Sequence, residues 1–507
     1  MLPTWLSIRA LLLPLLSLLT LPQPTQAKAV FAHFMVSNSQ NYTLSDWHAD
    51  ITLAKASSID AFALNAGHGQ IYNTASFHNA FAAADELAFK LFFSLDYSGD
   101  GGWPKDQVVT LLKNYTTHDA YFRHSDGRAL VSTFEGFQAA GDWGEIKEDV
   151  AKGSSNHSKE GGGEENKCCF FIPNWTSVGL NRASSVSAID GLMSWDAWPY
   201  GNQEMNTTED RQYLDILDGR AYIMPVSPWF YTNLRQFDKN WVWQGDDLWY
   251  TRWEQVVAVQ PEYVEILTWN DYGESHYIGP LREKAVGVMH GAGAPFDYVT
   301  GMPHDGWRAL LPYWIARYKG GKEDEGGGGV EIEEEVVSVW YRLSAADACG
   351  DGKTVGNNEG QKQHLMKPGD VLADRVFYSA LLEGGADVMV SIGGENRSVD
   401  WTEVPDGGRG VYHGSVPFDD RTGQVVVTLS RDGDFLAQMK GESIKDSCPG
   451  NLTNWNAWVG NATAVRTNRV NGGEGNGNGS ESAAAISRQM GPVLWVLCLA
   501  YFVFCFL

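Results

Sequence analysis

The sequence predicts an α/β protein, a TIM-type (β/α)8 barrel followed by a C-terminal β-sandwich. Apolar runs typical of buried strands alternate eight times with helical patterns over about 290 residues, the usual count and length of such a barrel. After a Gly- and Glu-rich break the helical period disappears and only short strands follow. A doubly wound open sheet is the alternative, but no Gly-rich phosphate-binding turn follows the first strand.

The barrel is predicted over residues 28–322. Its strands are expected at residues 30–36, 60–65, 89–96, 129–135, 168–173, 189–195, 221–229 and 263–270. The helical stretches between and after them are 44–57, 75–88, 105–115, a weak segment near Trp143, a short Ser/Ala-rich piece, 208–217, 247–259 and 307–318. Residues 153–167 are rich in Gly, Ser and charge, which predicts a disordered surface insertion between two units.

The second half of the chain begins after a predicted Gly/Glu-rich linker at residues 323–335. Short strands are expected at residues 336–343, 375–380, 386–392, 410–416, 424–429 and 435–439. Gly/Asp turns separate them, which favours a β-sandwich over residues 336–460. A flexible Gly/Asn/Ser stalk is predicted from residue 461 to residue 482.

Both ends of the chain carry targeting patterns. Residues 1–27 have the apolar run and small-residue end of a secretory signal peptide. The wholly apolar residues 493–507 follow small residues and a spacer, which predicts attachment of a glycosylphosphatidylinositol (GPI) lipid at Ser482 and removal of residues 483–507. A stop-transfer helix is the alternative, but about 15 apolar residues are short for a membrane span. We therefore expect a secreted protein at the cell surface or wall.

Nine N-x-S/T sequons agree with an extracellular glycoprotein. They lie at Asn41, Asn114, Asn156, Asn174, Asn206, Asn396, Asn451, Asn461 and Asn478. Asn174 stands beside an apolar strand and is one that we expect could stay unmodified. Of the cysteines outside the apolar tail, Cys349 and Cys448 are the preferred disulfide, whereas the adjacent Cys168 and Cys169 have no clear partner.

The charge limits the classes of partner. A net charge of −24 and a pI near 4.8 argue against nucleic acids and anionic membranes, which both require a basic surface. Contact with a membrane is expected only through the lipid anchor, and the protein is expected to be a monomer. No zinc-ligand spacing, Ser-His-Asp elbow or H-E-x-x-H motif occurs, so no metal or other cofactor is predicted.

The strongest candidate site is the nine-residue segment TWNDYGESH at residues 268–276. It places Asp271 and Glu274 directly after the eighth predicted strand, among aromatic residues. Hydrolysis of a glycosidic bond needs two such carboxyl groups, one to protonate the leaving oxygen and one to activate water or attack the sugar. A solvated acidic turn is the alternative. However, Asp96 also ends a predicted strand, and barrel enzymes gather their chemistry at these strand ends.

Further residues near the carboxyl ends of the strands are candidate sugar contacts, because aromatic rings stack on the C–H faces of pyranoses and polar side chains bind hydroxyls. These candidates are Asn65, His68, Trp195, Asp196, Trp198, Tyr200, Trp229, Trp269, Asn270, Tyr272 and His276.

Five segments resemble glycoside hydrolase family 71, the fungal endo-α-1,3-glucanases or mutanases. They are residues 30–67, 93–96 (FSLD), 172–179 (IPNWTSVG), 194–199 (SWDAWP) and 267–276 (LTWNDYGESH). The resemblance implies a catalytic barrel with a β-sandwich and hydrolysis of α-1,3-glucan with inversion at the anomeric carbon. It maps the family's acids onto Asp271, Glu274 and Asp96. The acidic Gly-rich insertions and the apolar tail depart from the family pattern and bear on location rather than chemistry.

The predicted mechanism has Glu274 as general acid, Asp271 as base and Asp96 holding substrate or water. The reverse assignment of Asp271 and Glu274 is left open, and the acid should be the group whose pKa is raised by its surroundings. Inversion requires carboxyl groups about 6.5–9.5 Å apart. Two other functions are considered: an anchored transglycosylase that remodels glucan, and a wall glucan-binding protein without catalysis.

Overall fold

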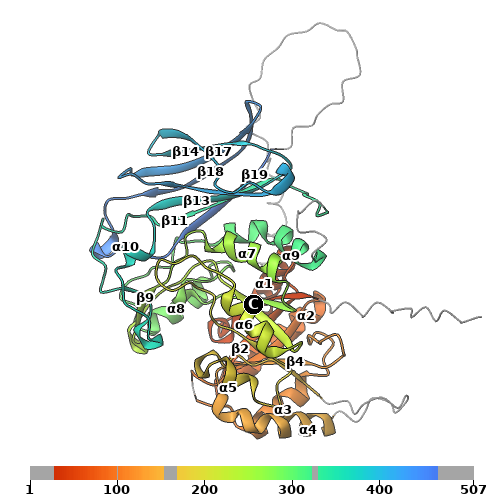
Figure 1. Ribbon diagram of the computed structural model, residues 1–507. Coiled ribbons are helices and arrows are strands. Elements are labelled where there is room, and N and C mark those ends of the chain that lie inside the picture. Colours follow the sequence, from red (N-terminus) through yellow and green to blue (C-terminus); the bar gives the residue numbers. More distant parts are fainter. Residues whose placement is uncertain (1–27, 100, 154–167, 322–328, 466–507) are drawn as a thin grey trace, which may run out of the picture. The chain divides into compact units, whose positions relative to one another are not determined.

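The computed structural model describes residues 28–99, 101–153, 168–321 and 329–465. The predicted signal peptide, the attachment signal with Ser482, nearly all of the 153–167 insertion, Asn156 and Asn478 lie outside these residues. The described chain up to Val465 forms one compact unit. Figure 1 shows a barrel with its surrounding helices and a sandwich of two β-sheets packed against it.

The (β/α)8 prediction is confirmed. Eight parallel strands form one sheet in the order β5-β4-β3-β2-β1-β10-β7-β6. The strands are β1 (Ala29–Met35), β2 (Ala61–Gly67), β3 (Lys90–Asp96), β4 (Leu130–Phe134), β5 (Phe170–Phe171), β6 (Gly191–Met193), β7 (Ala221–Val226) and β10 (Tyr263–Ile266). The edges meet where the Met193 N–H donates to the Pro173 carbonyl at 3.0 Å, so the ring closes between β5 and β6.

Helices surround this sheet and mostly follow the predicted pattern. They are α1 (Leu44–Ala56), α2 (Asn73–Glu86), α3 (Lys105–Tyr115), α4 (Trp143–Gly153), α5 (Leu180–Ser184), α6 (Thr208–Leu217), α7 (Leu248–Val259), α8 (Glu283–Gly291) and α9 (Leu311–Gly320). The sequence analysis did not predict α8. A capping box starts α1: Thr43 accepts from the Asp46 N–H, and Asp46 accepts from the Thr43 N–H at 2.8 Å.

A β-hairpin, also not predicted, lies between β7 and α7. Strands β8 (Tyr231–Leu234) and β9 (Lys239–Val242) are antiparallel, and Asp238 takes a left-handed conformation (φ 55°) at their turn. The short β12 (Val355–Gly356), from the second half of the chain, adds to β9 in parallel. Because the hairpin follows β7, it lies at the end of the barrel where catalysis is expected.

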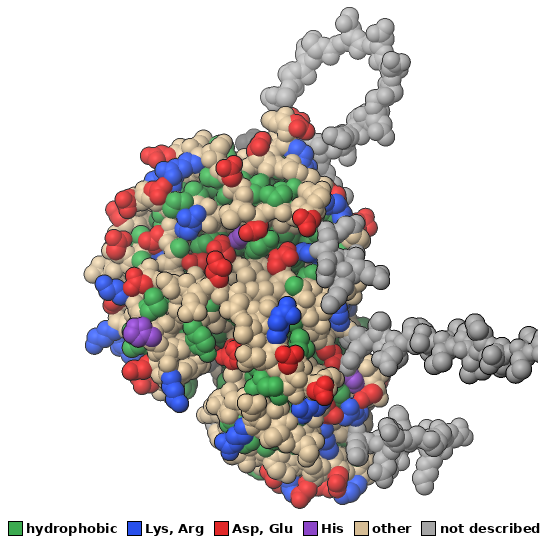
Figure 2. Space-filling view, in the orientation of Figure 1, with side chains coloured by type: hydrophobic (Ala, Val, Ile, Leu, Met, Phe, Trp, Pro, Cys, Tyr) green, Lys and Arg blue, Asp and Glu red, His purple; other side chains and the backbone are tan. Residues whose placement is uncertain are grey.

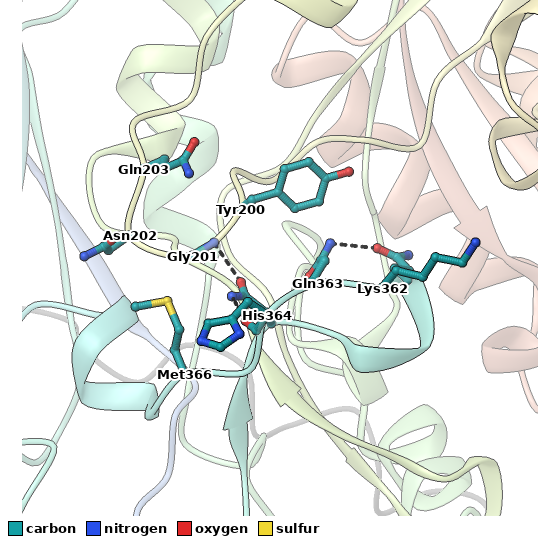
Figure 3. A pocket seen from close by; sticks show the side chains of 10 residues that line it. Tyr200, Gly201, Asn202, Gln203, Lys362, Gln363, His364 and Met366 are labelled. Atoms are coloured by element: carbon teal, nitrogen blue, oxygen red, sulfur yellow. Dashed lines mark hydrogen bonds between the residues drawn. The ribbon is translucent and has the colours of Figure 1, made fainter.

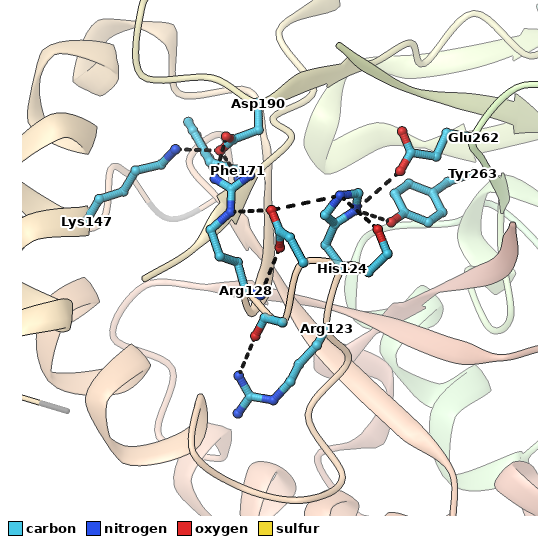
Figure 4. A network of polar contacts seen from close by, with 11 residues as sticks. Arg123, His124, Arg128, Lys147, Phe171, Asp190, Glu262 and Tyr263 are labelled. Carbon is cyan, nitrogen blue, oxygen red and sulfur yellow. Dashed lines mark hydrogen bonds and ion pairs between the residues drawn. The ribbon is translucent and has the colours of Figure 1, made fainter. Parts of the chain in front are cut away.

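A polar network closes the opposite end of the barrel (Figure 4). His124 lies before β4 and meets the Tyr263 hydroxyl at 2.7 Å. Asp190 lies before β6 and accepts from Arg128 at 2.6 Å and from the Phe171 N–H at 2.8 Å. These contacts tie together the amino ends of four strands, so we assign this end to stability rather than to chemistry.

The predicted β-sandwich is also present. One sheet has the order β16-β13-β11-β19 and the other β15-β14-β17-β18. The strands are β11 (Val336–Tyr341), β13 (Arg375–Leu382), β14 (Asp387–Ile392), β15 (Glu395–Val399), β16 (Gly410–Pro417), β17 (Gly423–Arg431), β18 (Asp434–Ile444) and β19 (Trp458–Thr463). Strands β15 and β19 were not predicted, and β19 continues past residue 461, where the stalk was expected to begin.

The sandwich packs on the barrel through buried contacts. The Trp340 indole N–H donates to the Asp246 carbonyl at 2.7 Å, and His413 meets the Asp247 carboxylate at 2.7 Å. Trp340 and Phe377 of the sandwich belong to the same hydrophobic cluster as the barrel core. This shared core explains why barrel and sandwich form a single compact unit.

In the described part of the chain, the structure shows one disulfide, two free cysteines and the exposure of the sequons. The structure contains the Cys349–Cys448 disulfide, with Cα atoms 6.2 Å apart, and this bridge spans 99 residues of sequence. The Cys168 and Cys169 sulfurs lie 2.8 Å apart and are not bonded. Among the described sequons, Asn174 is only 1% exposed and its side chain accepts from Thr176, so we withdraw it as a glycosylation site. The other described sequon asparagines are exposed.

Two surface properties bear on the expected partners. On the face drawn in Figure 2, acidic and basic side chains are interspersed over barrel and sandwich. Within residues 28–465, as far as the structure describes them, no helix is long and apolar enough to cross a membrane.

Candidate active site

A tightly bonded turn after β10 carries the two carboxylates. The Thr268 N–H donates to the His276 carbonyl at 2.7 Å, which closes the loop at its base. Within the loop, Asp271 caps a single 3₁₀ turn by accepting from the Glu274 N–H at 3.2 Å. The Tyr298 hydroxyl donates to the Gly273 carbonyl at 2.8 Å and holds the tip. The spacing of three residues therefore brings both side chains to one rigid site.

The carboxylates form a compact cluster with His276. His276 Nε2 lies 3.0 Å from a Glu274 oxygen and 3.9 Å from an Asp271 oxygen. One ligand atom from each of the three residues lies within 4.8 Å of the others. The Asp271 and Glu274 side chains are 18% and 13% exposed, so a substrate can reach them. One oxygen of Asp271 and one of Glu274 thus lie within 4.8 Å of each other. Carboxyl groups are roughly 6.5–9.5 Å apart in inverting glycosidases and roughly 5–5.5 Å apart in retaining ones.

The surroundings shift the two carboxyl pKa values in opposite directions. Burial, followed by the negative charge of Glu274, raises the pKa of Asp271. Burial alone would also raise the pKa of Glu274, but Lys239 and His276 outweigh it and hold that pKa well below its usual range. Glu274 is therefore ionised when Asp271 still carries a proton. Of the two assignments left open by the sequence, this favours Asp271 as the acid and Glu274 as the base.

Lys239 is the functional residue that the sequence analysis missed. Its ammonium contacts one Glu274 oxygen, while His276 contacts the other. The charge of Glu274 raises the pKa of Lys239, with smaller contributions from Asp271 and Asp96. Lys239 is the first residue of β9 in the unpredicted β8–β9 hairpin, where nothing in the sequence distinguishes it from a solvated lysine.

Asp96 faces the same charge cluster from the end of β3. Its carboxylate accepts from the Ser98 N–H at 2.7 Å and from the Gly99 N–H at 3.0 Å, which fixes its orientation. Because its charge acts on Lys239, it lies close enough to contribute to the electrostatics of the site. It does not belong to the compact group formed by Asp271, Glu274 and His276.

An aromatic wall stands behind His276. Phe230 stacks on the His276 ring at 5.6 Å, and Trp198 meets it edge-on at 5.5 Å. Trp243 stacks on Trp198 at 5.0 Å. Only Trp198 had been predicted, and it is 7% exposed. The wall shields His276 from water and so strengthens its interaction with Glu274.

Five predicted sugar contacts are instead buried parts of the scaffold. Trp229, Trp269, Asn270, Tyr272 and His276 are each at most 1% exposed. Without exposed faces, these side chains cannot stack on or bind a sugar in this structure. This corrects their predicted role as substrate contacts, and His276 acts on Glu274 instead.

The contacts of the buried residues show what they do. The Trp229 indole N–H donates to the Trp455 carbonyl at 2.9 Å and ties the barrel to the segment before β19. Asn270 pairs with both the N–H and the carbonyl of Met35 and so fixes the end of β1. The Tyr272 hydroxyl donates to the Pro280 carbonyl at 2.8 Å.

Trp269 is locked in place by a glycine. A Cβ on Gly279 would lie 2.5 Å from the Trp269 carbonyl oxygen, so only glycine fits where the chain crosses this residue. The Gly279 N–H donates to that same oxygen at 2.7 Å. This hydrogen bond fixes the chain where it leaves the active-site loop.

Asn65, His68 and Trp195 lie at the same end of the barrel. Asn65 is 4% exposed at the end of β2. His68 pairs with Gln107 at 3.0 Å. Trp195 is partly exposed and packs edge-on against His33, which in turn pairs with buried Glu265 at 2.7 Å.

Asp196 and Tyr200 follow β6. Burial raises the pKa of Asp196, which shares a hydrogen bond with Glu209. Tyr200 is 54% exposed, the largest exposure among the predicted aromatic contacts. Of the predicted aromatic residues, Trp195 and Tyr200 thus keep a ring surface that a sugar could reach.

The cluster of Asp271, Glu274 and His276 has ligand types that could also hold a cation. However, Lys239 already places a positive charge on Glu274. An added cation would be repelled by this ammonium, so the arrangement fits proton transfer better than metal binding.

Comparisons with known proteins identify the family of the whole chain. The sequence profile of Glycosyl hydrolase family 71 matches residues 26–471. A mutanase of Penicillium rubens is 32% identical over 462 residues, which is 90% of this chain and 93% of the relative. A glucan endo-1,3-alpha-glucosidase of Schizosaccharomyces pombe is 33% identical over 437 residues, covering 85% of this chain and 94% of the relative.

Two further matches are more partial. An ascus wall endo-1,3-alpha-glucanase of Schizosaccharomyces pombe is 32% identical over 297 residues, covering 58% of this chain and 66% of the relative. Among solved structures, a GH99 endo-alpha-mannosidase of Bacteroides thetaiotaomicron superposes with a TM-score of 0.44 at 12% identity, covering 58% of this chain and 97% of that one. The profile match over most of the sequence, supported by the two long alignments, shows that the chain belongs to glycosyl hydrolase family 71.

Proposed function

We propose that this protein is an extracellular glycoside hydrolase that cleaves α-1,3-glucosidic bonds within α-1,3-glucan. The proposal depends on the pair Asp271 and Glu274 at the carboxyl end of a family 71 barrel. The surroundings raise the pKa of Asp271 and lower that of Glu274, as an acid and a base require. The names of the long-aligned relatives, a mutanase and a glucan endo-1,3-alpha-glucosidase, support the substrate.

The proposed reaction uses the two carboxyl groups in different protonation states. Asp271 donates its proton to the glycosidic oxygen while the bond from that oxygen to the anomeric carbon breaks. Glu274 accepts a proton from the water whose oxygen bonds to the anomeric carbon. Lys239 and His276 hold Glu274 ionised and fix its orientation. Asp96 positions substrate or water from the neighbouring strand end.

The stereochemical course is a separate question. Family resemblance implies inversion, and we propose it. The short distance between the two carboxyl groups favours a second candidate, a retaining transglycosylase in which a carboxylate bonds to the sugar and a second sugar accepts the chain. In that case the product keeps its α-configuration.

One experiment tests substrate and stereochemistry together. The purified protein is incubated with insoluble α-1,3-glucan, β-1,3-glucan and α-1,4-glucan, and new reducing ends and anomeric configuration are followed by NMR. We expect soluble β-configured oligosaccharides from α-1,3-glucan alone. α-Configured products would replace inversion by retention, and transfer to other sugars without a net gain of reducing ends would identify the transglycosylase. Binding without new reducing ends would leave only a glucan-binding protein.

We further propose that the protein acts at the cell surface or wall. The predicted signal peptide and lipid-attachment signal support this location, and one relative is named as an ascus wall enzyme. Treatment of intact cells with a phosphatidylinositol-specific phospholipase should release the protein into the medium. Protein that stays on the cells, or that is found in the medium without treatment, would contradict the anchor.

A further inference from the structure

A cavity beside the active site is not used by the proposed chemistry. It measures about 410 Å³ and lies between the β6–α6 segment and the segment that joins β12 to α10 (Pro368–Val371). Its size is within the roughly 300–1,000 Å³ of typical ligand pockets. Figure 3 shows the two segments facing each other, with Tyr200 and Gln203 on one and Gln363 and His364 on the other.

Internal hydrogen bonds build this cavity before any ligand arrives. Asn357 is 3% exposed, accepts from the Gly201 N–H at 2.7 Å and donates to the His364 carbonyl at 2.7 Å. Gln363 accepts from the Asn358 N–H at 2.8 Å. The bond from Gly201 joins the two walls and the other bonds fix the segment between β12 and α10, so little ordering is needed on binding.

The groups left facing the cavity suit a neutral sugar. Asn202, Gln203 and Gln361 are exposed amides, which can donate to and accept from hydroxyl groups. Tyr200 offers a ring that is 54% exposed, and aromatic rings pack on the apolar C–H faces of pyranoses. Among the residues that the structure describes, the lining includes no carboxylate and one ammonium group, that of Lys362. This combination of amides and one open ring favours a carbohydrate over a cation or an apolar ligand.

Two stacked tryptophans connect the cavity to the catalytic cluster. The Trp243 indole N–H donates to the Gln363 side chain at 2.8 Å. Trp243 stacks on Trp198, which meets His276 edge-on at 5.5 Å. Both walls also follow elements at the carboxyl end of the barrel, because β12 pairs with β9 of the hairpin that carries Lys239.

We propose that this cavity is a subsite for a glucosyl unit of α-1,3-glucan several units from the bond that is cleaved. Tyr200 stacks on the sugar, and Gln203 and His364 bind its hydroxyls. The inference rests on the proposed function. It gives the segment between β12 and α10 a role in recognising long chains rather than in chemistry.

The test compares chain lengths. Tyr200→Ala and the double variant Tyr200→Ala/His364→Ala are assayed on a series of α-1,3-gluco-oligosaccharides of increasing length. We expect kcat/KM on long oligosaccharides to fall about 2- to 10-fold for the single variant, mainly through KM. Activity on the shortest cleaved oligosaccharide should stay at the wild-type level.

Phe435→Ala is the matched control, because this ring is 52% exposed on β18 and does not line the cavity. It should leave every length unaffected. Equal activity of wild type and both cavity variants at all lengths would overturn the subsite, as would an equal loss at all lengths including the shortest. A wild-type protein that cleaves no α-1,3-glucan oligosaccharide would instead overturn the proposed function.

Discussion

Asp271→Asn and Glu274→Gln are each expected to lower kcat on α-1,3-glucan by at least about 10²-fold. Asn cannot supply a proton to the leaving oxygen, and Gln cannot accept one from water. Both replacements keep the size of the side chain. The turn loses only the charge of each group, so the fold should survive. Reducing-end assays under initial-rate conditions measure the loss.

A substrate with a good leaving group separates the two roles. A glucosyl fluoride hardly needs protonation as it departs, so Asp271→Asn should recover much of its activity on such a substrate. Glu274→Gln should stay inactive because the water is still not activated. Recovery of Glu274→Gln alone would instead make Glu274 the acid. That result would conflict with the raised pKa of Asp271 and the lowered pKa of Glu274.

A matched control tests whether loss of a carboxylate charge by itself is harmless. Glu145 is a surface carboxylate on α4, 68% exposed and paired with Lys105. Glu145→Gln should keep full activity and stability, since exposed ion pairs contribute little. If it lost activity as strongly as the active-site variants, the assay would be reporting damage to the fold, and the catalytic assignment would lose its support.

The barrel and the place of the acids were predictable because both depend on local patterns. Each buried strand is a short apolar run, and Asp271 and Glu274 follow the run that becomes β10. A residue at the carboxyl end of a barrel strand has a predictable place in the fold, because all eight carboxyl ends meet on one face. The choice between acid and base was not predictable. It depends on Lys239, which is 35 residues away from Glu274 in sequence.

Several of the predicted aromatic sugar contacts were wrong for a related reason. Trp229 ends one predicted strand and Tyr200 follows another, but Trp229 is covered by the segment containing Trp455 and Tyr200 is 54% exposed. Whether a ring is open or buried is decided by distant chain that packs over it. The sequence contains no local signal for that packing, and the same holds for the cavity wall formed around Asn357.

Lys239→Met is expected to move the whole pH–rate profile to higher pH. The Lys239 ammonium holds the pKa of Glu274 well below its usual range, so its removal raises that pKa. Activity requires ionised Glu274, so as the pH falls the variant loses activity at a higher pH than the wild type. An opposite charge at this range shifts a carboxyl pKa by about 1–3 units, so the acidic limb should move up by about that amount.

The alkaline limb should move in the same direction. Lys239 also lowers the pKa of Asp271, so without it Asp271 keeps its proton to higher pH. A merely structural role for Lys239 would lower kcat without moving either limb. Lys239→Arg keeps the positive charge and should leave the limbs in place. If the profile of Lys239→Met could be superimposed on that of the wild type, Glu274 would owe its low pKa to other groups, and Lys239 would have no part in separating acid from base.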